Sequence, residues 1–151
     1  MSVDRARVRQ KIGFIRDQVR GLQRFRCMEL AEFASGELYE AAATRMLQIG
    51  VEAILDVCSH VAAREGWGVA RSYQDLIEIC AKNRLYPPGM AETLKGMARF
   101  RNRVVHLYDD VDPAEVLNII KTRLDDFAAF ISAILERYFP QDPEDQAGSP
   151  S

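Results

Sequence analysis

The chain of 151 residues carries 20 Lys and Arg against 22 Asp and Glu, and 48% of its residues are hydrophobic. A domain of this length buries about 70% of its unfolded surface without metals or disulfides, and three cysteines in no C-x-x-C pair beside two histidines favour neither a disulfide framework nor a zinc site. The net charge of −2 argues against a general nucleic-acid binder, and no apolar stretch reaches the roughly 20 residues that would cross a bilayer, so we expect a soluble protein of the reducing cytoplasm.

The charges are laid out in blocks whose signs alternate along the chain. Residues 1–26 carry eight basic and two acidic side chains, and residues 82–106 carry six and one. Residues 27–81 carry three basic and nine acidic side chains, and residues 107–151 carry three and ten. The two basic blocks would form a positive cleft if they met in the fold, whereas charge alone favours solvated helix faces of either sign.

Apolar residues recur at spacings of three and four almost throughout, which predicts an all-α fold, an up-and-down bundle of about five helices. The first expected helix spans residues 3–25 and has one apolar stripe. After an interrupted stretch over residues 27–36, the second spans residues 38–64 and is apolar around most of its circumference. It is therefore either central or shared with a second subunit. The residues that carry this pattern are Met46, Leu47, Ile49, Val51, Ala53, Ile54, Leu55 and Val57.

Local signals place the third and fourth helices. Gly66 ends the second helix, and Ser72 with Asp75 forms a capping box for a short third helix. Pro88 suits the first turn of a fourth helix over residues 90–106, because the N–H that proline lacks would have no intrahelical partner there.

The clearest start signal in the chain is the segment Asp112-Pro113-Ala114-Glu115, with Asp at the N-cap, Pro at the first helical position and Glu at the third. A fifth helix is expected to follow and to run to Phe139. Residues 1–139 would then form a single domain. The acidic tail over residues 140–151 lacks apolar residues and should be disordered.

Arg101 is the residue that such a bundle would least accommodate. At about 100° per residue, it lies in the middle of the apolar face of the fourth helix. A guanidinium there needs a carboxylate partner, a cleft or a subunit interface, because burying an unpaired charge is costly. Glu52 or Asp56 on the second helix would be the partner in a purely structural pair.

His106 lies near the end of the same helix, rotated about 140° from Arg101 and on one face with Asn102. Arg101 and His106 therefore converge only if the helix end is distorted or if a second subunit supplies one of them. The plain alternative is a surface histidine that interacts favourably with the helix C-terminal dipole.

Residues 101–108 read R-x4-H-x-Y, with Asn102 directly after the first Arg. In its setting, this pattern resembles the HepT toxins of the HEPN superfamily, small all-α ribonucleases encoded beside MNT-type nucleotidyltransferase antitoxins. The resemblance covers roughly residues 5–138. The further segments that fit the family, in the family's order, are residues 45–56, 72–75, 87–89 and 97–108.

The resemblance implies roles for particular residues. Arg101 and His106 match the catalytic pair, and Asn102 matches a supporting polar position beside the Arg. Tyr108 matches the tyrosine on which the partner nucleotidyltransferase places AMP to silence the toxin. The resemblance also implies a homodimer in which motifs from both subunits line one cleft.

The residue types themselves suit metal-independent cleavage of RNA without a cofactor. Histidine is the residue type suited to moving protons to or from the 2′-hydroxyl or the leaving 5′-oxygen near neutral pH, and His106 is the candidate. Arg101, supported by Arg103, would stabilise the charge that develops on the phosphate. The acidic residues near Asp112 are better explained by the start of the fifth helix than by a magnesium site.

Other candidates are weaker. His60 is expected to form a helical pair with Asp56, one turn before it. Trp67, Tyr73 and Tyr86 could stack on bases, although packing is the commoner use of such residues.

Two other functions remain open. One is a non-catalytic HEPN-like module that binds nucleotide or a partner protein. The other is a dimerisation scaffold in which Arg101 forms an interface salt bridge. The sequence does not name the RNA that a nuclease of this kind would cleave.

Overall fold

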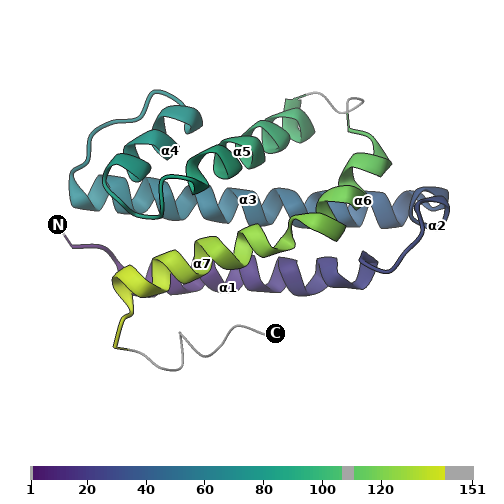
Figure 1. Cartoon of the computed structure of the whole chain (residues 1–151), viewed down its shortest axis with the longest axis horizontal. Coiled ribbons are helices and arrows are strands. Elements are labelled where there is room, and N and C mark those ends of the chain that lie inside the picture. Colours follow the sequence, from purple (N-terminus) through teal and green to yellow (C-terminus); the bar gives the residue numbers. More distant parts are fainter. Residues whose placement is uncertain (1, 107–110, 142–151) are drawn as a thin grey trace.

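The computed structural model describes residues 2–106 and 111–141, and in both ranges every regular element is a helix (Figure 1). The fold is all-α, as predicted. The tail over residues 142–151 and the segment 107–110 lie outside the described residues. In chain order the elements are α1 (Arg5–Leu22), the 3-10 helix η1 (Gln23–Phe25), α2 (Leu30–Ser35), α3 (Glu37–Glu65), α4 (Tyr73–Lys82), α5 (Met90–His106), α6 (Pro113–Thr122) and α7 (Leu124–Tyr138).

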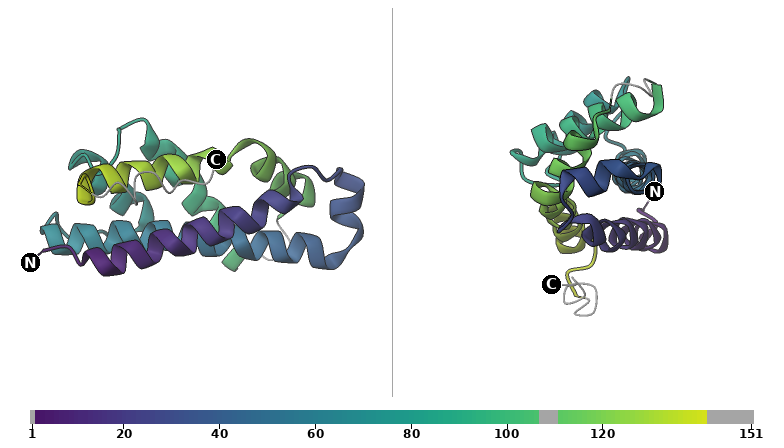
Figure 2. Two further views of the ribbon diagram at one scale, coloured as in Figure 1. Left: turned by 90° about the horizontal axis from the view of Figure 1, so that it is seen from below. Right: turned by 90° about the vertical axis from the view of Figure 1, so that its right-hand side faces the viewer.

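Helix α3 is the centre of the molecule. Figure 1 shows it running the length of the fold, with α4 and α5 on one side and α1 and α7 on the other. Helix α1 lies antiparallel to α3 and beside it (Figure 2). Six of the eight apolar residues that mark this helix in the sequence are buried within the one chain, so a central position explains its apolar circumference without a second subunit. They are Leu47, Val51, Ala53, Ile54, Leu55 and Val57.

One expectation about membranes needs correction. The stretch Leu38–Glu65 is long and apolar enough to cross a bilayer by length and composition, with a mean hydropathy of 1.3. The structure buries 56% of the window that meets this criterion, and α3 packs against α1, α4 and α5. The hydropathy of this stretch is therefore that of a core helix.

The N-terminal helices differ from the prediction at their ends. The expected helix over residues 3–25 is α1 followed by η1, and α1 begins after Asp4, whose carboxylate accepts a hydrogen bond from the backbone N–H of Arg7 at 3.2 Å. The stretch expected to be interrupted contains α2. Six residues are too few to show a helical repeat, and α2 is anchored by Phe33, which is fully buried and meets the ring of Phe25 edge to face at 5.9 Å.

The expected fifth helix is in fact two helices. Helices α6 and α7 meet at Arg123, whose ψ of 1° departs from helical geometry. The prediction of one helix to Phe139 is wrong because apolar residues keep helical spacing on both sides of the break. Helix α6 packs against α2 and α3, whereas α7 packs against α1, and the break lets the chain follow both surfaces.

The predicted signals at Gly66, Ser72 and Asp112 are confirmed, whereas Pro88 lies in the turn before α5, which begins at Met90, and not in its first turn. Gly66 ends α3 in the left-handed conformation, with φ of 71°, which favours glycine. The Ser72 hydroxyl accepts from the backbone N–H of Asp75 at 3.1 Å. The Asp112 carboxylate accepts from the backbone N–H of Ala114 at 2.9 Å.

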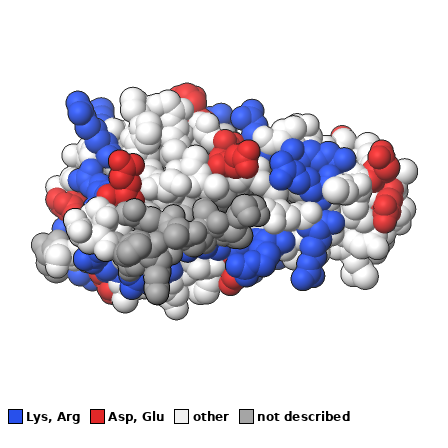
Figure 3. Space-filling view, turned by 60° about the horizontal axis from the view of Figure 1, so that its bottom comes forward, with Lys and Arg blue, Asp and Glu red and all other residues white. Residues whose placement is uncertain are grey.

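The two basic blocks do not form one cleft within the chain. The first block lies mainly on α1 and the second mainly on α5, and these helices occupy opposite sides of α3 (Figure 1). On the face that carries α1 and α7, Lys and Arg are interspersed with Asp and Glu wherever the surface is described (Figure 3). Solvated faces of mixed sign are therefore the better description of a single chain.

Candidate active site

Helix α5 carries the predicted catalytic segment. Its buried side chains, among them Leu94, Ala98 and Phe100, anchor it, and it packs against α3 and α4. Beyond them, Arg101 is half-buried and His106, the last residue of the helix, is exposed. Tyr108, the predicted modification site, lies outside the described residues.

The Arg101 guanidinium faces α3, where its Nε donates to Oε1 of Glu52 at 3.1 Å. The same Glu52 oxygen accepts from Nε2 of Gln48 at 3.0 Å, and Nη1 of Arg101 donates to Oδ1 of Asn102 at 3.2 Å. The guanidinium also lies over the ring of Tyr73, 5.6 Å from its centroid. Arg101 therefore has the carboxylate partner that its position on the apolar face required.

Of the two predicted partners for Arg101, only Glu52 forms the pair. Asp56, one turn further along α3, instead accepts from Nζ of Lys11 on α1 at 2.9 Å. The predicted pair between Asp56 and His60 does not form either. His60 uses Nε2 to accept from the backbone N–H of Asp4 at 2.9 Å, so its ring fastens the start of α1 to α3.

Arg103, the residue expected to support Arg101, binds a carboxylate of another helix. Its side chain forms a bidentate salt bridge with the Glu115 carboxylate on α6, in which Nη1 donates to Oε1 at 2.7 Å and Nη2 donates to Oε2 at 2.5 Å. The hydrogen bonds from Arg103 lower the pKa of Glu115. Residues two positions apart on a helix are rotated by about 200° from each other. Arg103 therefore links α5 to α6, whereas Arg101 faces α3.

The geometry of α5 separates Arg101 from His106. The helix is continuous to His106, so the distortion that would bring the two together is absent from Met90–His106. They keep the rotation of about 140° expected for five residues. Asn102 lies one turn before His106 and therefore on its side of the helix.

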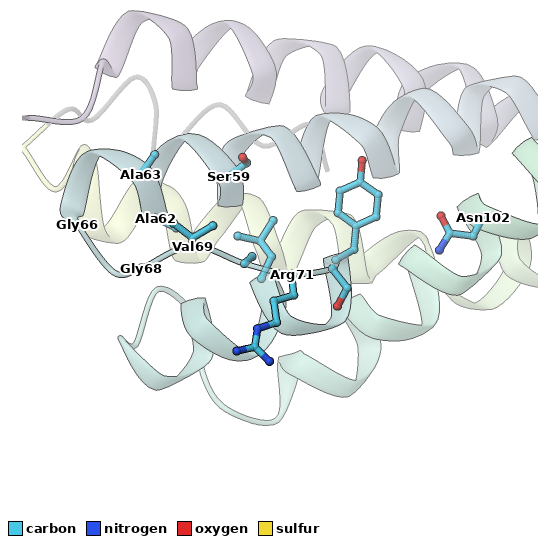
Figure 4. A pocket seen from close by; sticks show the side chains of 12 residues that line it. Ser59, Ala62, Ala63, Gly66, Gly68, Val69, Arg71 and Asn102 are labelled. Atoms are coloured by element: carbon cyan, nitrogen blue, oxygen red, sulfur yellow. The ribbon is translucent and has the colours of Figure 1, made fainter.

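A groove of about 900 Å³ opens beside Asn102 and Tyr73. Figure 4 shows Asn102 at one end of this groove and Gly66 and Gly68 at the other, with Ser59 and Ala62 projecting from α3. The remaining described residues that line it are Ala63, Val69, Ala70, Arg71, Ser72 and Leu76. The groove thus starts next to the residues of the predicted catalytic segment.

The three aromatic residues considered for base stacking lie in different environments. Tyr86 is a core residue whose hydroxyl donates to the carbonyl of Ile77 at 2.6 Å. Trp67 is half-buried, with the guanidinium of Arg137 over its ring at 5.3 Å. Tyr73 alone of the three lines the groove, with 39% of its surface exposed.

Sequence reasoning named Tyr73 only as one of three residues that could stack on bases, without placing it beside Arg101, and left Glu52 as one of two partners for Arg101. Tyr73 directly follows the N-cap of α4, a place where local patterns carry no information about a distant helix. Among the described residues, no group of three or more His, Cys, Asp or Glu side chains could hold a metal ion. The Asp112 carboxylate is engaged as an N-cap, and the two aspartates before it fall in segment 107–110.

Comparison with known proteins places this arrangement in a family. The family described as Ribonuclease HepT-like matches residues 15–134. A protein of Shewanella oneidensis named mRNA nuclease HepT is 31% identical over 88 residues, which are 58% of this chain and 66% of that protein. A protein of Aphanizomenon flos-aquae named tRNA nuclease HepT is 26% identical over 114 residues, 75% of this chain and 77% of that protein.

A solved structure shares the fold. It is described as a tri-AMPylated Shewanella oneidensis HEPN toxin in complex with MNT antitoxin, and it superposes with a TM-score of 0.79 at 25% identity. The superposition covers 86% of this chain and 97% of the toxin chain.

Proposed function

Because the chain belongs to the HepT-like ribonuclease family, we propose that it is an endoribonuclease toxin that cleaves RNA with Arg101 and His106. The observation that carries this proposal is the placement of α5: Arg101 lies over Tyr73, Asn102 lines the groove beside it, and His106 follows one turn after Asn102. The nuclease names of the two relatives support the reaction class.

In the proposed reaction, His106 moves protons and Arg101 stabilises charge. The exposed imidazole of His106 is free to exchange protons with the 2′-hydroxyl or the leaving 5′-oxygen of RNA. Arg101 presents a permanent cation to the phosphate. Glu52 holds Nε, and among the described residues none bonds Nη2, so that edge of the guanidinium is available to a phosphate oxygen.

We propose a homodimer as the active form. One continuous helix cannot bring Arg101 and His106 to the same side, so two copies of α5 would each contribute one residue to a cleft. Half-buried Val104, Val105 and Val111 line a second groove, of about 560 Å³, between α5 and α3. The α3 side of this groove carries Glu40, Thr44, Arg45 and Gln48, so the surface offers both apolar and polar contacts, as an interface between copies does.

We also propose that an MNT-type nucleotidyltransferase silences the toxin by transferring AMP to Tyr108. The support is the AMPylated relative seen with its MNT antitoxin and the position of Tyr108 two residues after His106. An added phosphodiester and purine there would exclude RNA by charge and bulk. Mass spectrometry of the chain co-expressed with such an enzyme checks this, since Tyr108→Phe should abolish the adenylyl mass.

The proposed site of action is the cytoplasm. RNA as substrate and the free buried thiols Cys58 and Cys80 suit action there.

The decisive test compares three variants on α5. Induced wild type should arrest growth, whereas Arg101→Ala and His106→Ala should each be tolerated, because general acid–base catalysis alone contributes about 10²- to 10⁴-fold. Arg99→Ala, an exposed arginine on the same helix, is the matched control and should remain toxic. Cleavage of RNA by the purified protein should persist in EDTA. Equal toxicity of all variants would refute the catalytic assignment, and loss of cleavage in EDTA would refute a metal-independent reaction.

A binding module without catalysis is the second candidate. The ion pair with Glu52 favours it, since a carboxylate at 3.1 Å already neutralises Arg101 in the isolated chain. This candidate predicts RNA binding by the wild type without cleavage, whereas a nuclease produces cut RNA.

A further inference from the structure

Tyr73 is an exposed aromatic side chain in contact with the proposed catalytic arginine. The residue is 39% exposed although the Arg101 guanidinium lies over its ring, 5.6 Å from the centroid. Tyr86, by contrast, is buried in the core. Tyr73 also lines the groove that begins beside Asn102.

The groove beside Tyr73 has room for a small ligand. Its wall is built largely from small side chains, so the chain leaves room above the α3 surface along its length (Figure 4). Its volume of about 900 Å³ falls in the range typical of ligand sites. The small residues that line it are Ala62, Ala63, Gly66, Gly68 and Ala70.

The polar groups of the groove suit an anionic ligand with hydrogen-bonding edges. Arg71 is the charged residue among the described residues that line it, and none of them is Asp or Glu. Ser59 and Ser72 add hydroxyl groups, and Asn102 adds an amide that can both donate and accept.

We propose that this groove is a subsite for one unpaired nucleotide of the RNA, next to the cleaved phosphate. The base stacks on Tyr73, the amide of Asn102 meets the base edge, and the phosphate lies toward Arg101. This inference rests on the proposed function. It adds that recognition requires a single-stranded nucleotide, because a base within a duplex cannot present its face to an aromatic ring.

The geometry gives the groove a specific place in the reaction. The Arg101 guanidinium contacts both Glu52 and the Tyr73 ring, so the same side chain belongs to the proposed catalytic site and borders the groove. A nucleotide stacked on Tyr73 therefore has its phosphate within reach of the group that would stabilise the transition state. Base stacking of this kind tolerates any base, so the subsite adds affinity with little sequence preference.

Binding is tested without cleavage. The probe is a short, fluorescent, single-stranded 2′-O-methyl RNA, which lacks the nucleophilic hydroxyl, and the readout is anisotropy with the full-length chain. Tyr73→Ala should weaken binding roughly 5- to 150-fold, the range for losing one stacked base. Tyr73→Phe keeps the ring and should bind as wild type. Leu38→Ala, which removes an exposed aliphatic side chain outside the groove, should also bind as wild type.

The outcomes separate this inference from the proposed function. If wild type cleaves RNA but Tyr73→Ala leaves both probe affinity and kcat/KM unchanged, the subsite is refuted and the nuclease stands. If wild type fails to cleave any RNA while Tyr73→Ala still weakens probe binding, the groove binds nucleotides and the proposed function fails. A Tyr73→Ala variant that changes oligomer mass in light scattering, with unchanged probe affinity, would show that a second copy fills the groove and would overturn the proposal.

Discussion

At the scale of single residues, the site depends on the Glu52 carboxylate, which the proposed reaction does not use for proton transfer. Glu52 accepts from both Arg101 and Gln48 through the same oxygen. Two donors on one acceptor restrict the position of the carboxylate, which in turn restricts the guanidinium. Glu52 is therefore a positioning residue for Arg101.

Glu52→Gln should lower kcat about 10- to 100-fold with little change in KM, because a misplaced transition-state group is costly while RNA contacts elsewhere persist. Stability should change by about 1 kcal/mol or less, since both side chains of the pair remain partly exposed. Asp56→Asn is the matched control, because it neutralises the neighbouring carboxylate bound to Lys11. A Glu52→Gln variant with unaltered kcat would contradict a positioning role.

His60 supplies a prediction about pH. Burial, followed by the charges of Arg64 and Arg7, lowers the pKa of His60 below its ordinary value. A depressed folded-state pKa means that the contribution to stability is complete above the unfolded pKa of about 6.5 and is lost as pH falls through the folded pKa. The bond from the backbone of Asp4 requires the neutral ring.

Denaturant unfolding at pH 7 and at pH 5 checks this. His60→Gln should cost about 0.5–1.5 kcal/mol at pH 7, the usual value of one hydrogen bond, and less at pH 5, where protonation of this imidazole in the unfolded state offsets part of its contribution to stability. A cost that is independent of pH would show that the imidazole does not titrate against folding. In an NMR titration, the ring protons of His60 should shift below pH 6.5.

At the scale of elements, the packing of the Phe127 ring of α7 against α3 depends on a glycine. A Cβ added at Gly50 would lie 3.0 Å from Cε1 of Phe127, whereas one added at Gly13 on α1 would meet nothing within 4 Å. Both glycines lie inside long helices, where alanine is intrinsically favoured. Packing therefore opposes the helix propensity of alanine at Gly50 but not at Gly13.

Thermal or denaturant unfolding of the two alanine variants separates the effects. Gly50→Ala should destabilise the fold by about 1–3 kcal/mol, because the Phe127 ring must move. Gly13→Ala should stabilise it by about 0.5–1 kcal/mol through helix propensity alone. If both variants gained stability, the contact between α3 and α7 would be looser than the structure describes.

At the scale of the whole molecule, the proposed reaction exceeds what one chain supplies. Arg101 and His106 face different directions from an unbroken helix, and the two basic blocks lie on opposite sides of α3. A symmetric dimer would pair Arg101 of one copy with His106 of the other in each of two clefts.

Mixing inactive variants tests this arrangement. Arg101→Ala and His106→Ala subunits, refolded together in equal amounts, should recover about a quarter of wild-type activity, since half of the dimers are mixed and each has one intact cleft. Each variant alone should stay inactive. A mixture without activity would place both residues of a site in the same chain, and a monomeric mass in light scattering would exclude the dimer.

Much of this protein follows from signals that act within four residues. The N-caps at Ser72 and Asp112, the left-handed Gly66 and the apolar repeats mark helix starts, ends and buried faces, and they suffice for the all-α fold. The R-x4-H-x-Y segment, with its neighbours, likewise identifies the family. Such features are readable because hydrogen bonds within a turn and the 3.6-residue period are properties of the local chain.

Long-range packing settled the remaining features. Arg123 breaks the last helix without any interruption of its apolar pattern, and Glu52 rather than Asp56 pairs with Arg101 because Asp56 faces Lys11 on α1. Arg103 was expected beside Arg101 and instead binds Glu115. Tyr73 comes next to Arg101 only because α4 folds back against α5. These partners are far apart in sequence, so their contacts depend on how helices dock, which no repeat within a single helix encodes.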